Sequence, residues 1–199
     1  EIIPEILEVD FSARPAGTVP YVLPASCPVC GAPTAQDEDG AFLRCTGVEC
    51  PAQLSRNISH FVSRDAMDIE GLGSAIVDGL IERGLIQSPA DIYYLTLEDV
   101  KSLWKSGSTA AKKLLNAIEA SKQQDLSRLI YALGIHQVGA KTGKVLASTF
   151  GSLDALMAAS LEELTAVPDV GEVTASNIHN WFAQEQSCHM IRRLRDAGV

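Results

Sequence analysis

Four of the five cysteines fall within 24 residues and have the spacing of metal ligands. Two residues separate Cys27 from Cys30, four separate Cys45 from Cys50, and fourteen lie between the pairs. Thiolates two to four residues apart can reach one ion from a single turn, and two such turns complete a tetrahedron with Zn–S distances of about 2.3 Å. Four protein ligands leave no open position, so we expect a structural Zn²⁺.

The alternative interpretation of these cysteines is a redox pair or a set of buried free thiols. The sequence carries no secretory signal, which favours a reducing compartment and therefore metal over disulfides. Cys188 stands far from the other four and is expected to be a small core residue of the last helix. The finger is also acidic, with Asp37, Glu38, Asp39 and Glu49 around Arg44, so we expect it to position domains rather than bind phosphate.

Glycines form a second chemical pattern, in four turns that each lie between apolar helical segments. A glycine permits positive φ and close backbone approach, and a central aliphatic residue can insert into the core. The helix that follows directs its free N–H groups and positive dipole end at whatever lies outside the turn, which suits a phosphate. The turns are Gly71-Leu72-Gly73, Lys105-Ser106-Gly107-Ser108, Gly134-Ile135-His136-Gln137-Val138-Gly139 and Pro168-Asp169-Val170-Gly171.

This pattern is the helix-hairpin-helix, and it allows an acidic protein to bind duplex DNA through the backbone, independently of base sequence. Lysines follow two of the turns, while Asp169 would repel phosphate and makes the fourth turn the weakest expected contact. A single glycine between helices is usually only a C-cap, but four turns in two matched pairs are a stronger signal. The candidate DNA-binding residues are Gly71, Gly73, Gly107, Gly134, Gly139, Gly171, Lys112, Lys113, Lys141 and Lys144.

Charge is distributed unevenly along the chain, which has a formal net charge of −9. Residues 101–150 contain eight basic and two acidic side chains, a local charge of +6 that leaves −15 for the remainder. A polyanion would bind there, although such a cluster can also be an ordinary solvated helix face. No run of about 18 apolar residues occurs, so no membrane span or membrane partner is expected.

The expected fold is mainly α-helical, with a small four-cysteine zinc-finger module followed by a helical domain of four helix-hairpin-helix motifs in two pseudo-repeated pairs. Prolines in residues 1–24 suggest an edge strand and a linker, and Asp39-Gly40 suggests a hairpin turn in the module of residues 25–51. Residues 52–199 form the helical domain, with repeats at about 67–123 and 133–183. The expected helix starts include Ser74, Ser88-Pro89, and capping boxes at Thr96/Asp99 and Ser160/Glu163.

In this order, the features resemble the C-terminal part of the bacterial NAD-dependent DNA ligases. That family carries an adenylation domain, an OB-fold, a four-cysteine finger, four helix-hairpin-helix motifs and a BRCT domain. Resemblance extends beyond the motifs, to Ile2-Ile3-Pro4 and Ser12-Ala13-Arg14-Pro15 (end of the OB-fold), His60-Phe61-Val62-Ser63-Arg64, Tyr131-Ala132-Leu133-Gly134-Ile135 and Val167-Pro168-Asp169-Val170-Gly171. It covers nearly the whole chain.

The resemblance implies that the full-length enzyme uses NAD and Mg²⁺ to seal 5′-phosphate/3′-hydroxyl nicks in replication and repair. The reactive Lys-x-Asp-Gly motif of the family occurs nowhere in the sequence, so we assign no catalytic residue and expect the chain to be inactive alone. Its implied role is to clamp double-stranded, nicked DNA, in a cytoplasmic, nucleoid-associated protein. A start at Glu1 without Met, and an end at Val199 without a BRCT domain, suggest a fragment that lacks the adenylation domain, most of the OB-fold and the BRCT domain.

Two other functions fit parts of the pattern. Helix-hairpin-helix turns also occur in DNA repair nucleases and glycosylases, where a suitably placed catalytic Asp or Lys would be needed. Asp154 and Asp196 are the late carboxylates that such an enzyme could use, and both look like surface residues. The remaining alternative is a zinc-stapled helical scaffold that binds protein, which salt-sensitive binding of nicked duplex would distinguish from the DNA binders.

Overall fold

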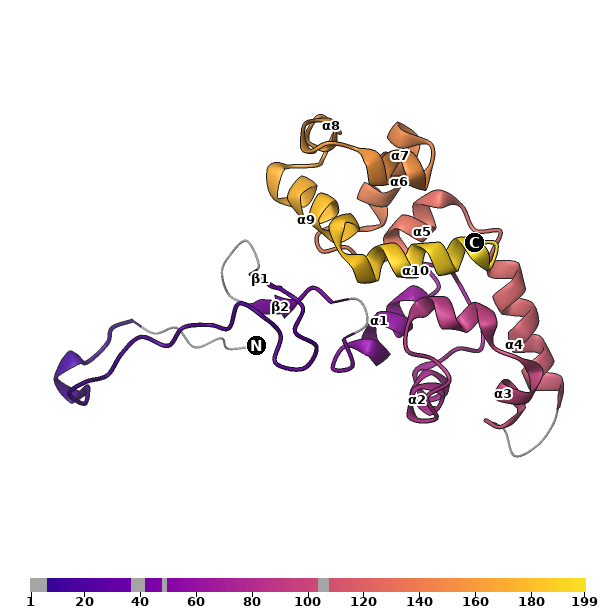
Figure 1. Ribbon diagram of the computed structural model, residues 1–199, viewed down its shortest axis with the longest axis horizontal. Helices are drawn as coiled ribbons and strands as arrows, with labels where there is room; N and C mark the ends of the chain where they lie inside the picture. Colours follow the sequence, from indigo (N-terminus) through magenta and orange to yellow (C-terminus); the bar gives the residue numbers. More distant parts are fainter. Residues whose placement is uncertain (1–6, 37–41, 48–49, 104–107) are drawn as a thin grey trace.

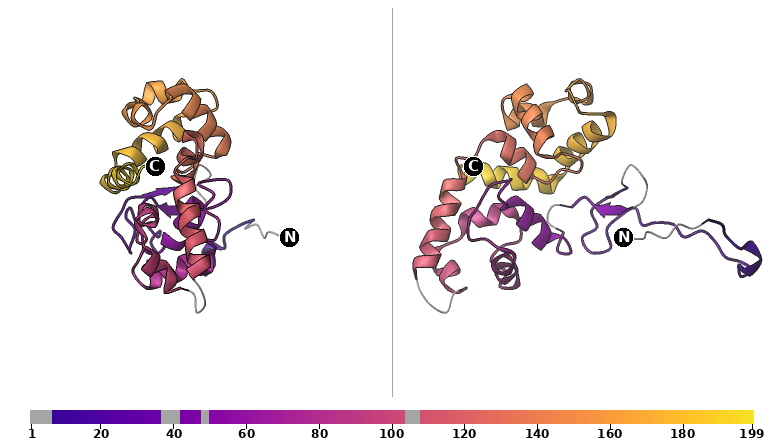
Figure 2. Two further views of the ribbon diagram at one scale, coloured as in Figure 1. Left: turned by 90° about the vertical axis from the view of Figure 1, so that its right-hand side faces the viewer. Right: turned by 180° about the vertical axis from the view of Figure 1, so that it is seen from behind.

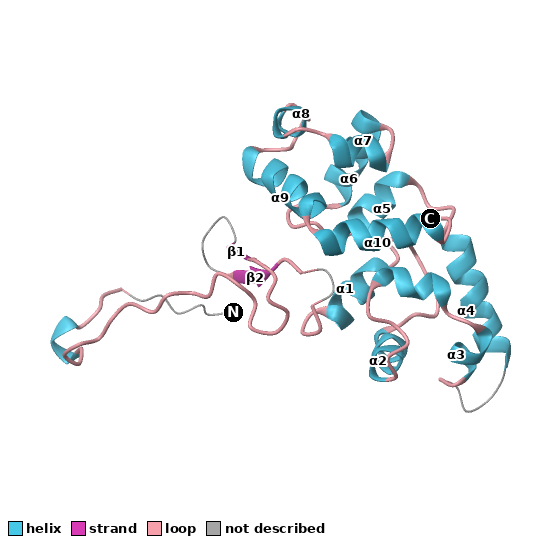
Figure 3. Ribbon diagram, viewed as in Figure 1, coloured by secondary structure: helices cyan, strands magenta, loops and turns pink. Residues whose placement is uncertain are grey.

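A computed structural model describes residues 7–36, 42–47, 50–103 and 108–199 of the chain. Helices dominate it, and a single two-stranded sheet lies near the N-terminal end (Figures 1 and 3). The order is a short 3₁₀ helix, the sheet, ten α-helices and a second 3₁₀ helix between α2 and α3. This confirms the mainly α-helical prediction with a small cysteine-bearing module.

The N-terminal arm runs away from the helical part as an exposed chain (Figure 1). Over residues 7–24 it contains one 3₁₀ helix, η1 (Phe11–Ala13), and no strand; most of the edge strand expected around residues 2–9 lies outside the described residues and stays a prediction. Pro15, Pro20 and Pro24 keep the following segment out of a sheet, as expected of a linker, because a proline has no N–H to donate.

The sheet consists of β1 (Thr34–Gln36) and β2 (Leu43–Cys45), which pair antiparallel with Thr34 opposite Cys45. An antiparallel pair so close in sequence is a hairpin. The expected turn at Asp39-Gly40 lies outside the described residues.

Two successive groups of helices follow the sheet in the same order. The first is α1 (Leu54–Phe61), α2 (Ser74–Glu82), η2 (Pro89–Tyr94), α3 (Leu97–Lys101) and α4 (Ser108–Ser121). The second is α5 (Leu126–Ala132), α6 (Ala140–Phe150), α7 (Leu153–Ala158), α8 (Leu161–Thr165) and α9 (Glu172–Ala183). A final helix, α10 (Glu185–Asp196), has no counterpart in the first group.

The same local devices recur in both groups and explain why the chain repeats its shape. Capping boxes open α3 at Thr96/Asp99 and α8 at Ser160/Glu163, as the sequence predicts. Ser88 precedes a helix with proline at its start, as expected, although the helix is 3₁₀. Ser74 is the first residue of α2 and not its cap, because the preceding Gly73 takes that position in extended conformation.

Long-range contacts hold the two groups together around one apolar core. Helix α10 lies between them and contacts both α9 and η2 (Figures 1 and 2). Arg128 of α5 donates from Nε to the carbonyl oxygen of Ala66 at 2.7 Å, just ahead of the first glycine turn. No helix within the described ranges has the length and apolar character needed to cross a bilayer.

Candidate metal centre and nucleic-acid interface

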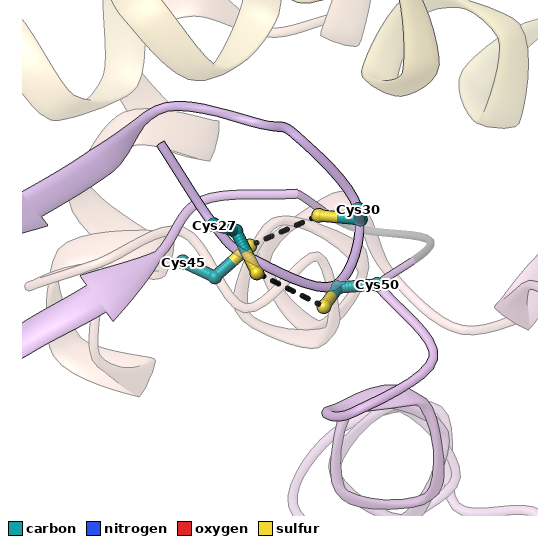
Figure 4. A group of neighbouring side chains, drawn as sticks. All are labelled: Cys27, Cys30, Cys45 and Cys50. Atoms are coloured by element: carbon teal, nitrogen blue, oxygen red, sulfur yellow. Dashed lines mark hydrogen bonds between the residues drawn. The ribbon is translucent and has the colours of Figure 1, made fainter. Parts of the chain in front are cut away.

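The four clustered cysteines converge on one point from two turns of the finger, as the labelled side chains in Figure 4 show. Cys27 and Cys30 lie in a tight turn closed by the Gly31 N–H, which donates to the Cys27 carbonyl at 2.9 Å. Gly31 has φ +74°, a conformation that glycine adopts without strain. Cys45 ends β2, and Cys50 follows just before α1. The turn therefore presents two thiols, and the end of β2 with the segment that follows it presents the other two.

The spacing of the sulfur atoms fits a tetrahedral ion. All four Sγ atoms lie within 4.8 Å of one another. The Sγ atoms of Cys27 and Cys50 are 3.8 Å apart, and those of Cys30 and Cys45 are 3.4 Å apart. A zinc tetrahedron with Zn–S distances of about 2.3 Å has sulfur–sulfur edges of about 3.8 Å. The four residues therefore fit one structural Zn²⁺, and Cys188 lies outside the cluster.

Backbone groups and burial shift the pKa values of three of the thiols in different directions. The N–H groups of Cys30 and Val29 lower the pKa of the Cys27 thiol to about 6. Burial raises the pKa of Cys45 to about 12 and raises the pKa of Cys50. A cation is therefore needed to hold Cys45 and Cys50 as thiolates at neutral pH, and its binding would release protons. The Gly47 N–H, 3.3 Å from the Cys45 sulfur, would then stabilise a bound thiolate.

Three of the four glycine turns share one backbone geometry at the start of the next helix. Gly73, Gly139 and Gly171 are the N-caps of α2, α6 and α9, with φ of −70°, −84° and −81° and ψ of 165°, 175° and 172°. An aliphatic residue precedes each cap and inserts into the core; these are Leu72, Val138 and Val170. The fourth expected turn, with Gly107, lies outside the described residues.

Nothing in the described part of the chain requires glycine at these three caps. Their φ values suit any residue, and a Cβ built on Gly73, Gly139 or Gly171 meets no atom within 4 Å. A side chain there would instead project into the space outside the helix start. Glycine at such a position leaves the helix start open to the close approach of another molecule.

The residue two positions before each cap adopts positive φ, which sequence reasoning overlooked. It is Gly71 in the first turn (φ +97°), Gln137 in the third (φ +63°) and Asp169 in the fourth (φ +64°). Gln137 also accepts hydrogen bonds at its Oε1 from Thr174 (3.3 Å) and Asn177 (3.2 Å), which join the third turn to α9. Aligning the turns on their cap glycines would have exposed this position.

The remaining candidate glycine, Gly134, lies at the end of α5 and not at the start of α6. It has φ +66°, and its Cβ would meet the His60 ring at 3.5 Å. His60 Nε2 in turn lies 2.8 Å from the Tyr131 carbonyl oxygen. Gly134 thus shapes the exit from α5, and its expected role in DNA contact stays a prediction.

The basic side chains of residues 101–150 divide into paired and unpaired groups. Lys122 pairs with Glu119 at 2.6 Å, and Lys141 pairs with Asp169 at 2.7 Å. Arg128 donates to the carbonyl oxygen of Ala66. Lys112, Lys113 and Lys144 are exposed and form no ion pair within the described part of the chain.

A cleft of about 750 Å³ lies next to the third turn, between the finger with α1 on one side and later helices on the other. The β1–β2 hairpin and α1 form one wall, with Arg44 and Arg56. Residues 132–138 and α9 form the other, with Asn177 and Asn180. No carboxylate lines it among the described residues. The acidic residues of the finger, Asp37, Glu38, Asp39 and Glu49, lie outside the described residues, so the expectation that the finger positions domains rather than binds phosphate stays a prediction.

Comparison with known proteins agrees with both features. Residues 26–52 match the NAD-dependent DNA ligase C4 zinc finger domain, and residues 128–191 match the helix-hairpin-helix motif. Over its full 199 residues, the chain is 51% identical to a DNA ligase of Caldicellulosiruptor bescii. It is 46% identical to a DNA ligase of Myxococcus xanthus over the same length.

The chain belongs to the NAD-dependent DNA ligase family. It spans 30% of the length of these relatives. The matched motif covers the third and fourth turns, so the presence of four helix-hairpin-helix motifs stays a prediction. Together, the cysteine cluster and the matched finger support a structural zinc in this family member.

Proposed function

We propose that this chain clamps duplex DNA around a nick, as the non-catalytic part of an NAD-dependent ligase. Helix starts at Gly73, Gly139 and Gly171, together with the second turn at Gly107, would receive phosphates from the two strands. Contact through backbone N–H groups makes binding independent of base sequence. Exposed Lys112, Lys113 and Lys144 would add charge around these contacts.

The observation that carries this proposal is the open space at the three described cap glycines. Serine is a better N-cap than glycine, because its hydroxyl accepts a hydrogen bond from the first turn. A glycine retained where serine would improve the helix is explained if a phosphate must approach the N–H groups closely. Family membership supports the same role.

The wider enzyme would seal 5′-phosphate/3′-hydroxyl nicks, with NAD and Mg²⁺ acting in other parts of the polypeptide. No Lys-x-Asp-Gly motif occurs in this sequence, and the cysteines are its only described cluster of metal ligands. We place the finger at residues 25–51 and the DNA-binding domain at 52–199, after an OB-fold end and linker at 1–24. The zinc ligands are Cys27, Cys30, Cys45 and Cys50, and the protein acts in the cytoplasm at the nucleoid.

The test is fluorescence anisotropy of the chain with a nicked duplex, as a function of salt, for the native chain and Gly139→Ser. Four phosphate contacts predict a slope of about −3 to −4 for log affinity against log salt concentration. Gly139→Ser should weaken binding about tenfold while the melting temperature stays equal or rises, since serine caps α6. Salt-independent or undetectable binding would favour the protein-binding scaffold. Base release from damaged duplex would favour a glycosylase.

A further inference from the structure

One ion pair joins the third and fourth turns on the side where their helices begin. Lys141 is the second residue of α6, and Asp169 lies two residues before the cap glycine of α9. Lys141 Nζ is 2.7 Å from Asp169 Oδ2, and both side chains are largely exposed, at 82% and 55%. The pair therefore lies in solvent, between the two helix starts.

A lysine at this position carries a small electrostatic cost, which a nearby anion offsets. The N-terminal end of a helix is positively charged, and α6 has no acidic residue in its first turn. Asp169 supplies the missing negative charge from the neighbouring turn. The hydrogen bond and the attraction between the two charges raise the pKa of Lys141.

The location of Asp169 is informative as well. The equivalent positions in the first and third turns hold Gly71 and Gln137, which are uncharged. Among the three described turns, only the fourth, with Asp169, has a carboxylate two residues before its cap glycine. That carboxylate pairs with Lys141, the cation two residues after the Gly139 cap.

We propose that Asp169 is an internal competitor for the DNA phosphate, holding Lys141 in the free protein and yielding it when duplex binds. This inference rests on the proposed DNA-binding function and refines it. Exposed ion pairs are weak and exchange readily, so Lys141 can transfer from the carboxylate to a phosphate. Asp169 then remains beside the duplex as a repulsive charge. It limits affinity at the third and fourth turns, and so favours release of the DNA.

The decisive variant is Asp169→Asn, measured by anisotropy with nicked duplex at several salt concentrations. Asparagine adopts positive φ as readily as aspartate, so the turn is preserved. We expect affinity at low salt to rise about three- to tenfold, because Lys141 is freed and a like charge is removed. The salt slope should steepen by up to about 0.9, because Lys141 then neutralises its phosphate without leaving an unpaired carboxylate beside the duplex.

A matched control removes the same charge elsewhere. Asp154 of α7 pairs with Arg195 of α10 at 2.5 Å, away from the helix starts that carry the cap glycines. Asp154→Asn changes net charge equally and should leave affinity within about twofold. Equal effects of the two variants would overturn the proposal.

A second arm tests whether the effect acts through Lys141. In a Lys141→Met background, Asp169→Asn should give a clearly smaller gain than in the native chain. An undiminished gain would mean that Asp169 acts by general repulsion, and would overturn the competition. If the native chain binds duplex and Gly139→Ser weakens that binding, but Asp169→Asn has none of the expected effects, only the inference about Asp169 is contradicted. If no duplex binding is found, the proposed function falls with it.

Discussion

The guanidinium of Arg193 on α10 pairs with the carboxylate of Asp91 in η2, which lies 102 residues earlier in the chain. Asp91 also accepts hydrogen bonds from the N–H groups of Gln87 and Ser88, both at 2.8 Å. The Arg193 guanidinium stacks over the Tyr94 ring at 4.7 Å, and the Tyr94 hydroxyl donates to the Arg193 carbonyl at 2.9 Å. This contact fixes the last helix against the first helical group.

Asp91→Asn should lower the free energy of unfolding and make that free energy less dependent on pH in the acidic range. Burial opposes ionisation of Asp91, but the Gln87 N–H, Arg193 and the Ser88 N–H outweigh it and lower the pKa of the carboxyl. A lowered folded-state pKa stabilises the fold above the unfolded value of about 3.9, and that stability is lost as pH falls through the folded pKa. We expect a loss of about 2 kcal/mol at pH 7.

Urea unfolding between pH 2 and pH 7 measures this difference. The difference in unfolding free energy between native and variant chains should be greatest above about pH 5 and should shrink toward pH 2. Glu82→Gln, at an exposed residue of α2, serves as a control with little effect. A gap that stays constant with pH would show that the contribution of Asp91 is not that of an ionised carboxylate.

Gly143→Ala should destabilise the chain even though alanine favours helices. Helices α5 and α6 pack so closely that a Cβ on Gly143 would lie 2.8 Å from the Ser127 carbonyl oxygen. Relieving that contact requires a backbone shift, with a cost of about 1–3 kcal/mol. The matched change, Gly79→Ala in α2, meets only the end of the Leu103 side chain at 3.4 Å.

Thermal unfolding of the two variants separates packing from helix propensity. Gly79→Ala should be neutral or stabilising by up to about 1 kcal/mol. If Gly143→Ala were as stable as Gly79→Ala, the close approach of α5 and α6 would be contradicted.

Cys50→Ser should abolish zinc binding and loosen the finger while leaving the helices folded. The hydroxyl that replaces the thiol is a poor zinc ligand, and the remaining three thiolates leave one position open. Atomic absorption should give about one zinc per native chain and far less in the variant. Backbone amides of residues 25–51 should lose protection from hydrogen exchange, as they should after chelation.

Cys188→Ser provides the control for this experiment. The Cys188 sulfur donates to the Phe182 carbonyl at 3.0 Å, a bond that a serine hydroxyl can also make. Zinc content should be unchanged. Equal zinc in the Cys50→Ser and native chains would refute the assigned ligands.

Lys144→Met should weaken duplex binding at low salt and reduce the magnitude of the salt slope by about 0.9, because one phosphate contact is lost. Lys144 is exposed on α6, five residues after the Gly139 cap, and forms no ion pair among the described residues. Arg192→Met removes an exposed charge from α10 and should leave the slope unchanged. If both variants shift the slope equally, the interaction is a diffuse charge effect and not a contact at the third turn.

The sequence by itself determined the features that depend on residues close along the chain. The spacing of Cys27, Cys30, Cys45 and Cys50 predicted the cluster that the fold assembles. The capping boxes at Thr96/Asp99 and Ser160/Glu163 were equally predictable, since cap and partner are three residues apart. Family membership followed from the order of these motifs, and the comparisons confirm it.

Only the tertiary structure decided which distant residues meet. Sequence spacing could not indicate that Asp169 would pair with Lys141, or Asp91 with Arg193, because those contacts depend on how whole helices pack. The N-cap of α2 is Gly73 and not Ser74, since the backbone of the preceding turn sets where the helix begins. Local rules specify helix ends and metal turns, whereas the competition between a carboxylate and a phosphate arises only when two turns are brought side by side.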